Sequence, residues 1–406
     1  MRPLAWILPL AASGRALLPS SATADARTLL ATRALRGFAD GVVSVLLASW
    51  LASLGFTAFQ IGAIVAATLL GSAALTLTVG LLGHRLRRRT VLLAASGLMF
   101  ATGLGFAGVT SFWPLLVVAF AGTLNPSAGD VTLFLPTEQA LLADSTASRD
   151  RTLIFAWYNL AGGLAGALGA LGAGLDPRAG FLVYALVALL VAAGYRRLSP
   201  QAGLDGSRPA AAALGRSRRV VLQLSALFCI DAFGGGFVVQ ALLALWLQSR
   251  FGLPLATVGA FFFAAGLLGA ASQFVSSSLA ARIGHVRTMV FTHLPSNVLL
   301  ILAALVPQAP LAMALLLARS MLSQMDVPAR QAYVMALVPP EERAAASSVT
   351  NVPRALAAAL SPILAGALLE HTSAYGWPLI CAGALKIVYD LLLFASFARL
   401  APREEM

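Results

Sequence analysis

Apolar residues recur along the chain in runs of about 20 residues that are separated by short polar, glycine- or proline-containing joins. A helix of that length spans the hydrocarbon core of a bilayer. Twelve such runs are expected, and they begin near Thr28, Phe59, Thr90, Trp113, Thr152, Gly180, Arg219, Ala256, Arg287, Pro310, Ala345 and Tyr375. The pattern predicts an all-α membrane protein with twelve transmembrane helices.

The longest polar join divides the twelve runs into two sets of six. It reads RRLSPQAGLDGSRPAAAALGRSRR and contains proline, glycine and serine. We expect a cytoplasmic lead-in at 1–27, an N-terminal six-helix half at 28–196, a cytoplasmic linker at 197–218, a C-terminal six-helix half at 219–400 and a cytoplasmic tail at 401–406. Residues 1–27 also resemble a signal peptide, with an arginine, an apolar stretch and small residues, so cleavage of this segment is an open alternative.

Composition and charge restrict the class further. Hydrophobic residues make up 59% of the chain and charged residues 11%, whereas soluble domains have about 25% charged residues. The net charge of +12 would suggest nucleic-acid binding in a soluble chain. Here the arginines gather in short joins, above all in GLLGHRLRRRT (Gly80–Thr90), and such loops stay cytoplasmic. We expect a multi-pass protein of the cell (inner) membrane, with both termini cytoplasmic and no nucleic-acid partner.

The two sets of six runs are internal repeats. A weaker copy of the arginine loop, SSLAARIGHVR, begins 197 positions after Gly80. Trp50 and Trp246 are separated by 196 positions, and Arg151 and Arg343 by 192. Two parallel six-helix repeats are typical of one large class of secondary transporters.

The arginine loop resembles a known signature. Gly80, Arg85, Arg88 and Arg89 match the pattern GxxxDRxGRR of the major facilitator superfamily, with His84 at the usual aspartate and Arg87 at the usual glycine. The stretch AYVMALVPPEER (Ala332–Arg343) resembles the loop between spans ten and eleven of that family. The resemblance covers residues 28–400 and implies the facilitator fold and transport by alternating access. It implies a cytoplasmic gating loop formed by Gly80, Arg85, Arg88, Arg89, Glu138, Arg151 and Arg343, with Glu138 as a partner for the loop arginines.

Ionisable residues inside the runs are candidates for a proton and substrate cavity, because charge in hydrocarbon is costly. The candidates are Asp40, Asp130, Asp231, Asp326, Arg330, Arg319 and Arg354. Four of them are aspartates in spans one, four, seven and ten, which line the central cavity in the facilitator fold. We expect Asp130, which has no basic neighbour within two helical turns, to carry the coupling proton.

Several of these charges have possible partners on their own helix. Arg36 and Asp40, Asp326 and Arg330, and Lys386 and Asp390 are each spaced i, i+4, so each pair shares a helix face. Lys386 and Asp390 are interpreted as a structural pair. For Arg330 we also predict a charge pair across the two halves, with Asp130 or Glu138 as its partner.

Backbone irregularities are expected in two spans. Asn125-Pro126 should break span four, and Pro328 should remove a backbone hydrogen bond between Asp326 and Arg330 in span ten. The glycines of span five, Gly162 to Gly174, indicate close helix packing. An antiporter motif is the alternative, although its usual Gly-Pro dipeptide is absent.

These features predict a transporter and not an enzyme. The chain has no recognisable catalytic motif, its two cysteines stand alone, and its histidines are scattered over loops and span ends, so no cofactor or metal is expected. We expect a monomeric, proton-coupled permease for a small organic solute, with protons and the lipid bilayer as its other partners. Efflux of amphipathic compounds is slightly favoured. The alternatives are proton-symport uptake of an organic anion and a non-transporting receptor or scaffold on the same fold.

Overall fold

The computed structural model describes residues 22–82, 87–127, 132–147, 150–199, 214–215, 217–339, 342–371 and 376–398. Every regular element within these residues is a helix. The first half contains α2 (Ala24–Ser53), α3 (Ala58–Leu82), α4 (Arg88–Gly108), α5 (Phe112–Ala121), α6 (Leu135–Asp144), α7 (Arg151–Ala170), the short 3-10 helix η3 (Leu171–Gly174) and α8 (Pro177–Arg196). The second half contains α9 (Arg218–Gly236), α10 (Gln240–Phe251), α11 (Leu255–Ile283), α12 (His285–Leu305), α13 (Ala309–Ser323), α14 (Asp326–Leu337), α15 (Arg343–His371) and α16 (Trp377–Phe397).

The predicted transmembrane architecture is confirmed. Ten helical segments of the described chain are long and apolar enough to cross a membrane, and they correspond to ten of the twelve predicted runs. The fourth run is divided into α5 and α6, and the tenth into α13 and α14. The seventh run is also divided, into α9 and α10, although together they are still long enough to span.

Two of the breaks contact each other across the halves. The break after α5 contains Asn125-Pro126, as predicted, and the Asn125 side chain accepts a hydrogen bond from the Ser127 N–H at 3.1 Å. The break after α9 was not predicted, and it follows three consecutive glycines, Gly234–Gly236, which weaken a helix. The N–H of Ala241, at the start of α10, donates to the carbonyl of Pro126 at 3.1 Å. Backbone groups freed by one break are thus satisfied by the other.

The break in the tenth run lies at Gln324 and Met325, before Asp326, and not at Pro328. Pro328 is the third residue of α14, where a backbone N–H has no partner inside the helix. A proline at this position therefore costs no helical hydrogen bond. The expectation that Pro328 removes a backbone hydrogen bond between Asp326 and Arg330 is wrong.

The glycines of span five pack α7 closely against α2. A Cβ atom at Gly37 would lie 2.4 Å from the carbonyl oxygen of Gly162, and one at Gly41 would lie 2.0 Å from that of Gly166. No real Cβ contact is that short, so the two backbones approach at a distance that only glycine permits. The packing interpretation of these glycines is confirmed.

The repeat is visible in matching helix ends. Arg151 donates from Nε to the carbonyl of Ala143 near the end of α6, at 3.0 Å. Arg343 donates in the same way to the carbonyl of Met335 near the end of α14, at 3.1 Å. Carbonyls in the last turn of a helix lack intrahelical donors, so each arginine caps the helix that precedes it.

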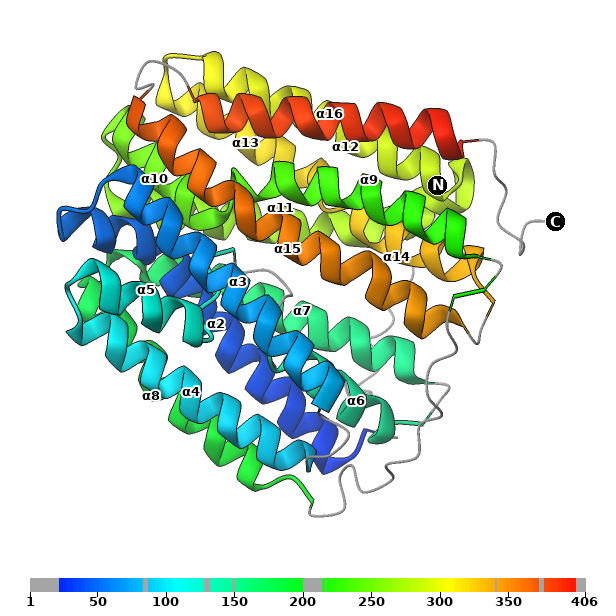
Figure 1. The fold of residues 1–406 in the computed structure, drawn as a ribbon, viewed down its shortest axis with the longest axis horizontal. Helices are drawn as coiled ribbons and strands as arrows, with labels where there is room; N and C mark the ends of the chain where they lie inside the picture. The colour runs from blue at the N-terminus through cyan, green and yellow to red at the C-terminus, as the bar shows by residue number, and fades with distance from the viewer. Residues whose placement is uncertain are drawn as a thin grey trace, which may run out of the picture.

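The two halves contact each other at the end of the bundle opposite to the start of α2 and the end of α16. There Gly62 of α3 meets the carbonyl of Pro362, and Gly366 of α15 meets the carbonyl of Ala58, each at 2.3 Å from an added Cβ. The N–H of Phe59 also donates to Glu370 at 3.0 Å. Figure 1 shows α3 and α15 close together at this end and diverging toward the other end, where α2 begins and α16 ends.

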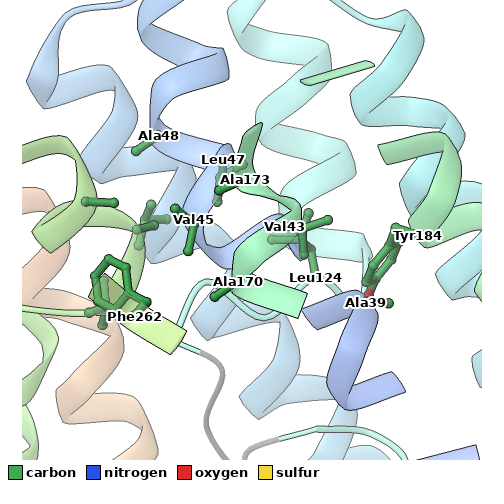
Figure 2. Packing of buried hydrophobic residues seen from close by; sticks show 14 of the residues in the cluster. Ala39, Val43, Val45, Leu47, Ala48, Leu124, Ala170, Ala173, Tyr184 and Phe262 are labelled. Atoms are coloured by element: carbon green, nitrogen blue, oxygen red, sulfur yellow. The ribbon is translucent and has the colours of Figure 1, made fainter. Parts of the chain in front are cut away.

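A buried apolar cluster includes residues of both halves. It includes Val45 of α2, Ala170 of α7 and Phe262 of α11, which Figure 2 labels. Leu243 of α10 belongs to the same cluster. The apolar packing of this cluster therefore joins the two halves.

Candidate functional site

A cavity of about 710 Å³ lies between the halves. Helices from both halves line it: α2 and α7 from the first, and α9, α10, α11, α13, α14 and α16 from the second. Its described charged lining residues are Arg33, Asp40, Arg319 and Lys386. Its polar uncharged lining includes Asn159, Gln240, Gln273, Gln324 and Gln331, and its largest apolar side chains include Phe261 and Phe262. The wall is therefore apolar in part, with three cations and one carboxylate among the described charges.

Asp231 of α9 is the centre of a cluster of charges beside this cavity. Its carboxylate lies 2.6 Å from Lys386 Nζ of α16 and 3.4 Å from Arg330 of α14. His293 Nε2 of α12 lies 3.7 Å away, and Arg354 of α15 lies 3.9 Å away. The Asp231 side chain is 4% exposed. Lys386, Arg330 and Arg354 thus provide positive charge that offsets the desolvation of this buried carboxylate.

His293 connects Asp231 to a second buried carboxylate. Its Nδ1 lies 2.9 Å from Asp390 Oδ1 of α16. The Asp390 side chain has no exposed surface, and its other oxygen accepts from Asn297 Nδ2 at 3.0 Å. The imidazole is thus placed between two carboxylates, one on each side of the ring.

A different cluster occupies the interior of the first half. Glu138 of α6 forms an ion pair with Arg36 of α2, and the two side chains are 0% and 2% exposed. Tyr158 and Tyr195 donate to the two oxygens of Glu138 at 2.5 and 2.6 Å, and Thr32 donates at 3.2 Å. Glu138 therefore has a partner for each lone-pair direction that a carboxylate normally uses.

The two clusters occupy related positions with the charges exchanged. The capping arginines put Arg330 in register with Glu138, because each lies the same number of residues before its arginine. In the first half the carboxylate is on the fourth span and the arginine on the first, and in the second half the reverse holds. Tyr389 of α16 interacts with Arg330, as Tyr195 of α8 interacts with Glu138.

Some predicted charge pairs are present and others are replaced. Asp326 and Arg330 do pair on α14, at 2.9 Å. Arg36 pairs with Glu138 and not with Asp40, which lines the cavity instead. A carboxylate on another helix therefore satisfies Arg36 more fully than the one on its own helix face.

Lys386 and Arg330 show the same correction. Lys386 pairs with Asp231, and Asp390 pairs with His293. The predicted Lys386–Asp390 pair is therefore wrong. Arg330 contacts Asp231 and Asp326, both in its own half, and Glu138 is occupied by Arg36. The other predicted partner, Asp130, lies outside the described residues. Its expected role as the proton carrier is therefore not tested by this structure.

The described arginines of the predicted gating loop contact helix ends, and none of them is among the residues that line the cavity. Arg88, at the start of α4, forms an ion pair with Asp144 of α6 at 2.6 Å, and Arg89 donates to the carbonyl of Arg196 at the end of α8. Gly80 lies in the last turn of α3, and Arg85 lies outside the described residues. Asp144 is therefore the acidic partner in this structure, whereas Glu138 is buried away from the loop.

Sequence reasoning missed three residues of the site. Arg33 lines the cavity next to Asp40, on the same helix. His293 was assigned to a span end but is buried at the centre of the second half. Lys386 was assigned to a local pair but reaches the cavity wall. A lysine in the middle of a span was the available signal, because Lys386 is a costly residue unless it contacts a charge or water.

Comparison with known proteins identifies a family that this chain matches. A family model described as Major Facilitator Superfamily matches residues 29–318. A relative in Saccharomyces cerevisiae, described as uncharacterized membrane protein YJR124C, is 27% identical over 428 residues, which cover 93% of this chain and 94% of the relative.

Three solved structures share the fold at low sequence identity. A mutant of the nucleoside transporter NupG has a TM-score of 0.76 at 13% identity, over 92% of this chain and 100% of that chain. A bacterial homologue of the human lysosomal transporter Spinster, in an inward-facing and unoccupied conformation, has a TM-score of 0.70 at 13% identity, over 93% and 96%. The human organic anion transporter MFSD10 (TETRAN) has a TM-score of 0.64 at 19% identity, over 91% and 98%.

Proposed function

This chain belongs to the Major Facilitator Superfamily, and from that premise we propose that it transports amphipathic organic anions across a membrane by alternating access. The fold supplies two halves that can expose a central site to one side at a time. The halves of this chain are in contact at one end, around Gly62 and Gly366, and the cavity lies between them. The arginine-rich joins support a cytoplasmic location for the opposite end.

The cationic lining of the cavity carries the proposal. Arg33 comes from the first half, and Arg319 and Lys386 come from the second. Nε of Arg319 is buried and has no hydrogen-bond partner within the described part of the chain. A buried guanidinium N–H without an acceptor is costly, so an anion that accepts from it would gain a charge-assisted hydrogen bond.

The apolar part of the cavity wall indicates that the ligand also has an apolar portion. Phe261 and Phe262 lie on one helix, α11, and Leu243 and Leu316 also line the cavity. Small-molecule sites of this kind bind the body of a ligand by apolar contact and orient it by a few polar groups. This geometry favours an organic anion over an uncharged amphipathic compound. It agrees with the solute class of MFSD10, which is described as an organic anion transporter.

Binding of a matched pair of compounds to the purified protein tests the proposal. The anion is 2-naphthalenesulfonate, which keeps its charge at every pH used, and the neutral analogue is 2-naphthalenesulfonamide. Tryptophan fluorescence or calorimetry in detergent measures the affinities. We expect the sulfonate to bind at least tenfold more tightly, because a hydrogen bond to a charged group contributes about 1.5–3 kcal/mol.

Two variants locate the binding site. Arg319→Gln should weaken sulfonate binding by roughly ten- to a hundredfold, on the same energetic scale. Arg282→Gln, an exposed arginine in the last turn of α11, is the matched control and should leave binding unchanged. Equal affinity for the neutral analogue, or sulfonate binding that Arg319→Gln does not alter, would contradict the proposal.

A further inference from the structure

The two charge clusters differ in how firmly each holds its central carboxylate. Glu138 has one cation, Arg36, and its remaining contacts are hydroxyl groups. Asp231 instead has Lys386, Arg330, Arg354 and His293 within 4 Å and shares Arg330 with Asp326. A carboxylate with several basic neighbours can exchange one positive partner for another. The second half therefore contains the cluster in which partners can be exchanged.

Lys386 is the partner that can leave. Its Nζ bonds Asp231 at 2.6 Å, and the same residue lines the cavity. A lysine ammonium is a point charge on a flexible stem with three donors, so it can turn from one acceptor to another. An anion in the cavity competes with Asp231 for this ammonium, and binding of the anion removes the closest positive charge from Asp231.

His293 is placed to replace that charge. With Nδ1–H donating to Asp390, the neutral imidazole presents an unprotonated Nε2 toward Asp231, 3.7 Å away. A proton added at Nε2 would give Asp231 a new donor and a new positive neighbour. Asn297, which donates to the second oxygen of Asp390, keeps that carboxylate in position.

The charges around His293 come from every helix packed nearby. They are Asp231 on α9, Arg319 on α13, Asp326 and Arg330 on α14, Arg354 on α15 and Lys386, Tyr389 and Asp390 on α16. The charged residue of α11, Arg282, lies in the last turn of that helix. An anion held by Lys386 takes the closest positive neighbour from Asp231, and a proton on His293 replaces it.

We propose that His293 is the proton-binding site that couples anion binding to proton uptake, with one proton on Nε2 for each anion held by Lys386. This inference rests on the proposed function, because it requires an anion in the cavity. The proton enters from water in the cavity and bonds to Nε2, and no other bond changes. By linkage the effect is reciprocal: the proton strengthens anion binding by the factor by which the anion strengthens proton binding.

Calorimetry of 2-naphthalenesulfonate binding counts the protons directly. Titrations in two buffers with different ionisation enthalpies give the number of protons taken up per anion bound. Because the sulfonate does not titrate, every proton is bound by the protein. We expect uptake of about one proton per anion bound in the wild type. The apparent affinity for the anion should increase as the pH falls, by up to about tenfold per pH unit.

Two variants separate His293 from the other histidines. His293→Gln should still bind the sulfonate but take up no proton, and its affinity should become independent of pH. His285→Gln, at the start of the same helix and outside the cluster, should keep the proton uptake of the wild type. Monodisperse size-exclusion profiles for both variants show that the comparison is between folded proteins.

The outcomes distinguish the coupling site from the proposed function. Sulfonate binding with proton uptake in the wild type and without it in His293→Gln supports the inference. Binding without proton uptake in the wild type, or with the same uptake in His293→Gln, overturns the inference and leaves anion transport standing. If the neutral sulfonamide binds as well as the sulfonate, or the sulfonate does not bind, the proposed function fails and the inference fails with it.

Discussion

Glu138 has no exposed surface, and its ion pair with Arg36 is surrounded by hydroxyl donors. The guanidinium of Arg36 also lies over the ring of Phe134, 4.2 Å from the ring centroid. A buried pair of this kind adds little net stability compared with apolar residues, but removing one partner leaves an uncompensated charge. The pair therefore fixes the relative positions of α2 and α6.

Glu138→Gln should destabilise the protein strongly. The Arg36 side chain, 2% exposed, would keep its charge without a counter-ion, at a cost of about 3–5 kcal/mol. Thermal unfolding in detergent measures the loss. The double variant Arg36→Met with Glu138→Leu is the control and should recover most of the lost stability. A Glu138→Gln protein as stable as the wild type would show that this pair does not hold the half together.

The identities of the buried charges could be predicted from the sequence, but most of their partners could not. Asp231, Asp326, Arg319 and Arg330 were selected because charges are rare inside spans. The i, i+4 rule then paired neighbours on one helix, which gains only about 0.2–0.5 kcal/mol per pair. Lys386 instead contacts a carboxylate on another helix, because in a buried site full compensation outweighs a local contact. A single sequence contains no distances between helices.

At the scale of the helices, the fit of α2 against α7 determines where the cavity can form. Residues of both helices, including Gly37 and Gly166, line the cavity near their line of contact. The approach is limited by backbone against backbone at Gly41 and Gly166, so no side chain can move aside to accept a larger residue. Overpacking of this kind costs about 1–3 kcal/mol.

Gly41→Ala should therefore lower the thermal unfolding midpoint, because its Cβ would lie 2.0 Å from the carbonyl oxygen of Gly166. The matched control is Gly97→Ala in α4, where an added Cβ has nothing within 4 Å. That control should be neutral or stabilising by about 0.5–1 kcal/mol, because alanine favours a helix over glycine. If both variants change stability equally, close packing is not the role of Gly41.

The sequence predicted the spans better than their interruptions. The periodicity of apolar runs located all twelve segments, and Asn125-Pro126 located one break. The break after Gly234–Gly236 depends on a partner in the other half, the carbonyl of Pro126, which receives the N–H of Ala241. Propensity alone does not decide whether such a glycine run bends, breaks or continues a helix.

At the scale of the whole molecule, the structure is closed at one end by small residues of α3 and α15. Gly62 contacts Pro362, and Gly366 contacts Ala58. Alternating access requires these contacts to separate when the other end closes. Their stability therefore sets the population of this conformation relative to the opposite one.

Gly62→Leu should shift the population toward a conformation that is open at this end. A clash that costs the closed end about 1–3 kcal/mol changes the ratio of the two states roughly 5- to 150-fold. The labelling rate of a cysteine at Ser320, a cavity residue, measures the shift, with an impermeant thiol reagent added on this side of proteoliposomes. Cys229 and Cys381 are replaced by serine.

Gly108→Leu is the control for this experiment. Gly108 is the last residue of α4, at the closed end of the molecule, and an added Cβ there has nothing within 4 Å. It should label at the rate of the parent protein. A Gly62→Leu protein that labels no faster than Gly108→Leu would show that the α3–α15 contact does not close this end.

Transport of a permanently charged anion into proteoliposomes tests the central claim, that the cation-lined cavity carries organic anions, most directly. Radiolabelled 2-naphthalenesulfonate crosses a bilayer slowly by itself, so uptake reports the protein. We predict counterflow uptake that is saturable, is not inhibited by 2-naphthalenesulfonamide and falls at least tenfold in Arg319→Gln when measured below saturation. Uptake no faster than in protein-free liposomes, or unchanged in Arg319→Gln, would contradict the account.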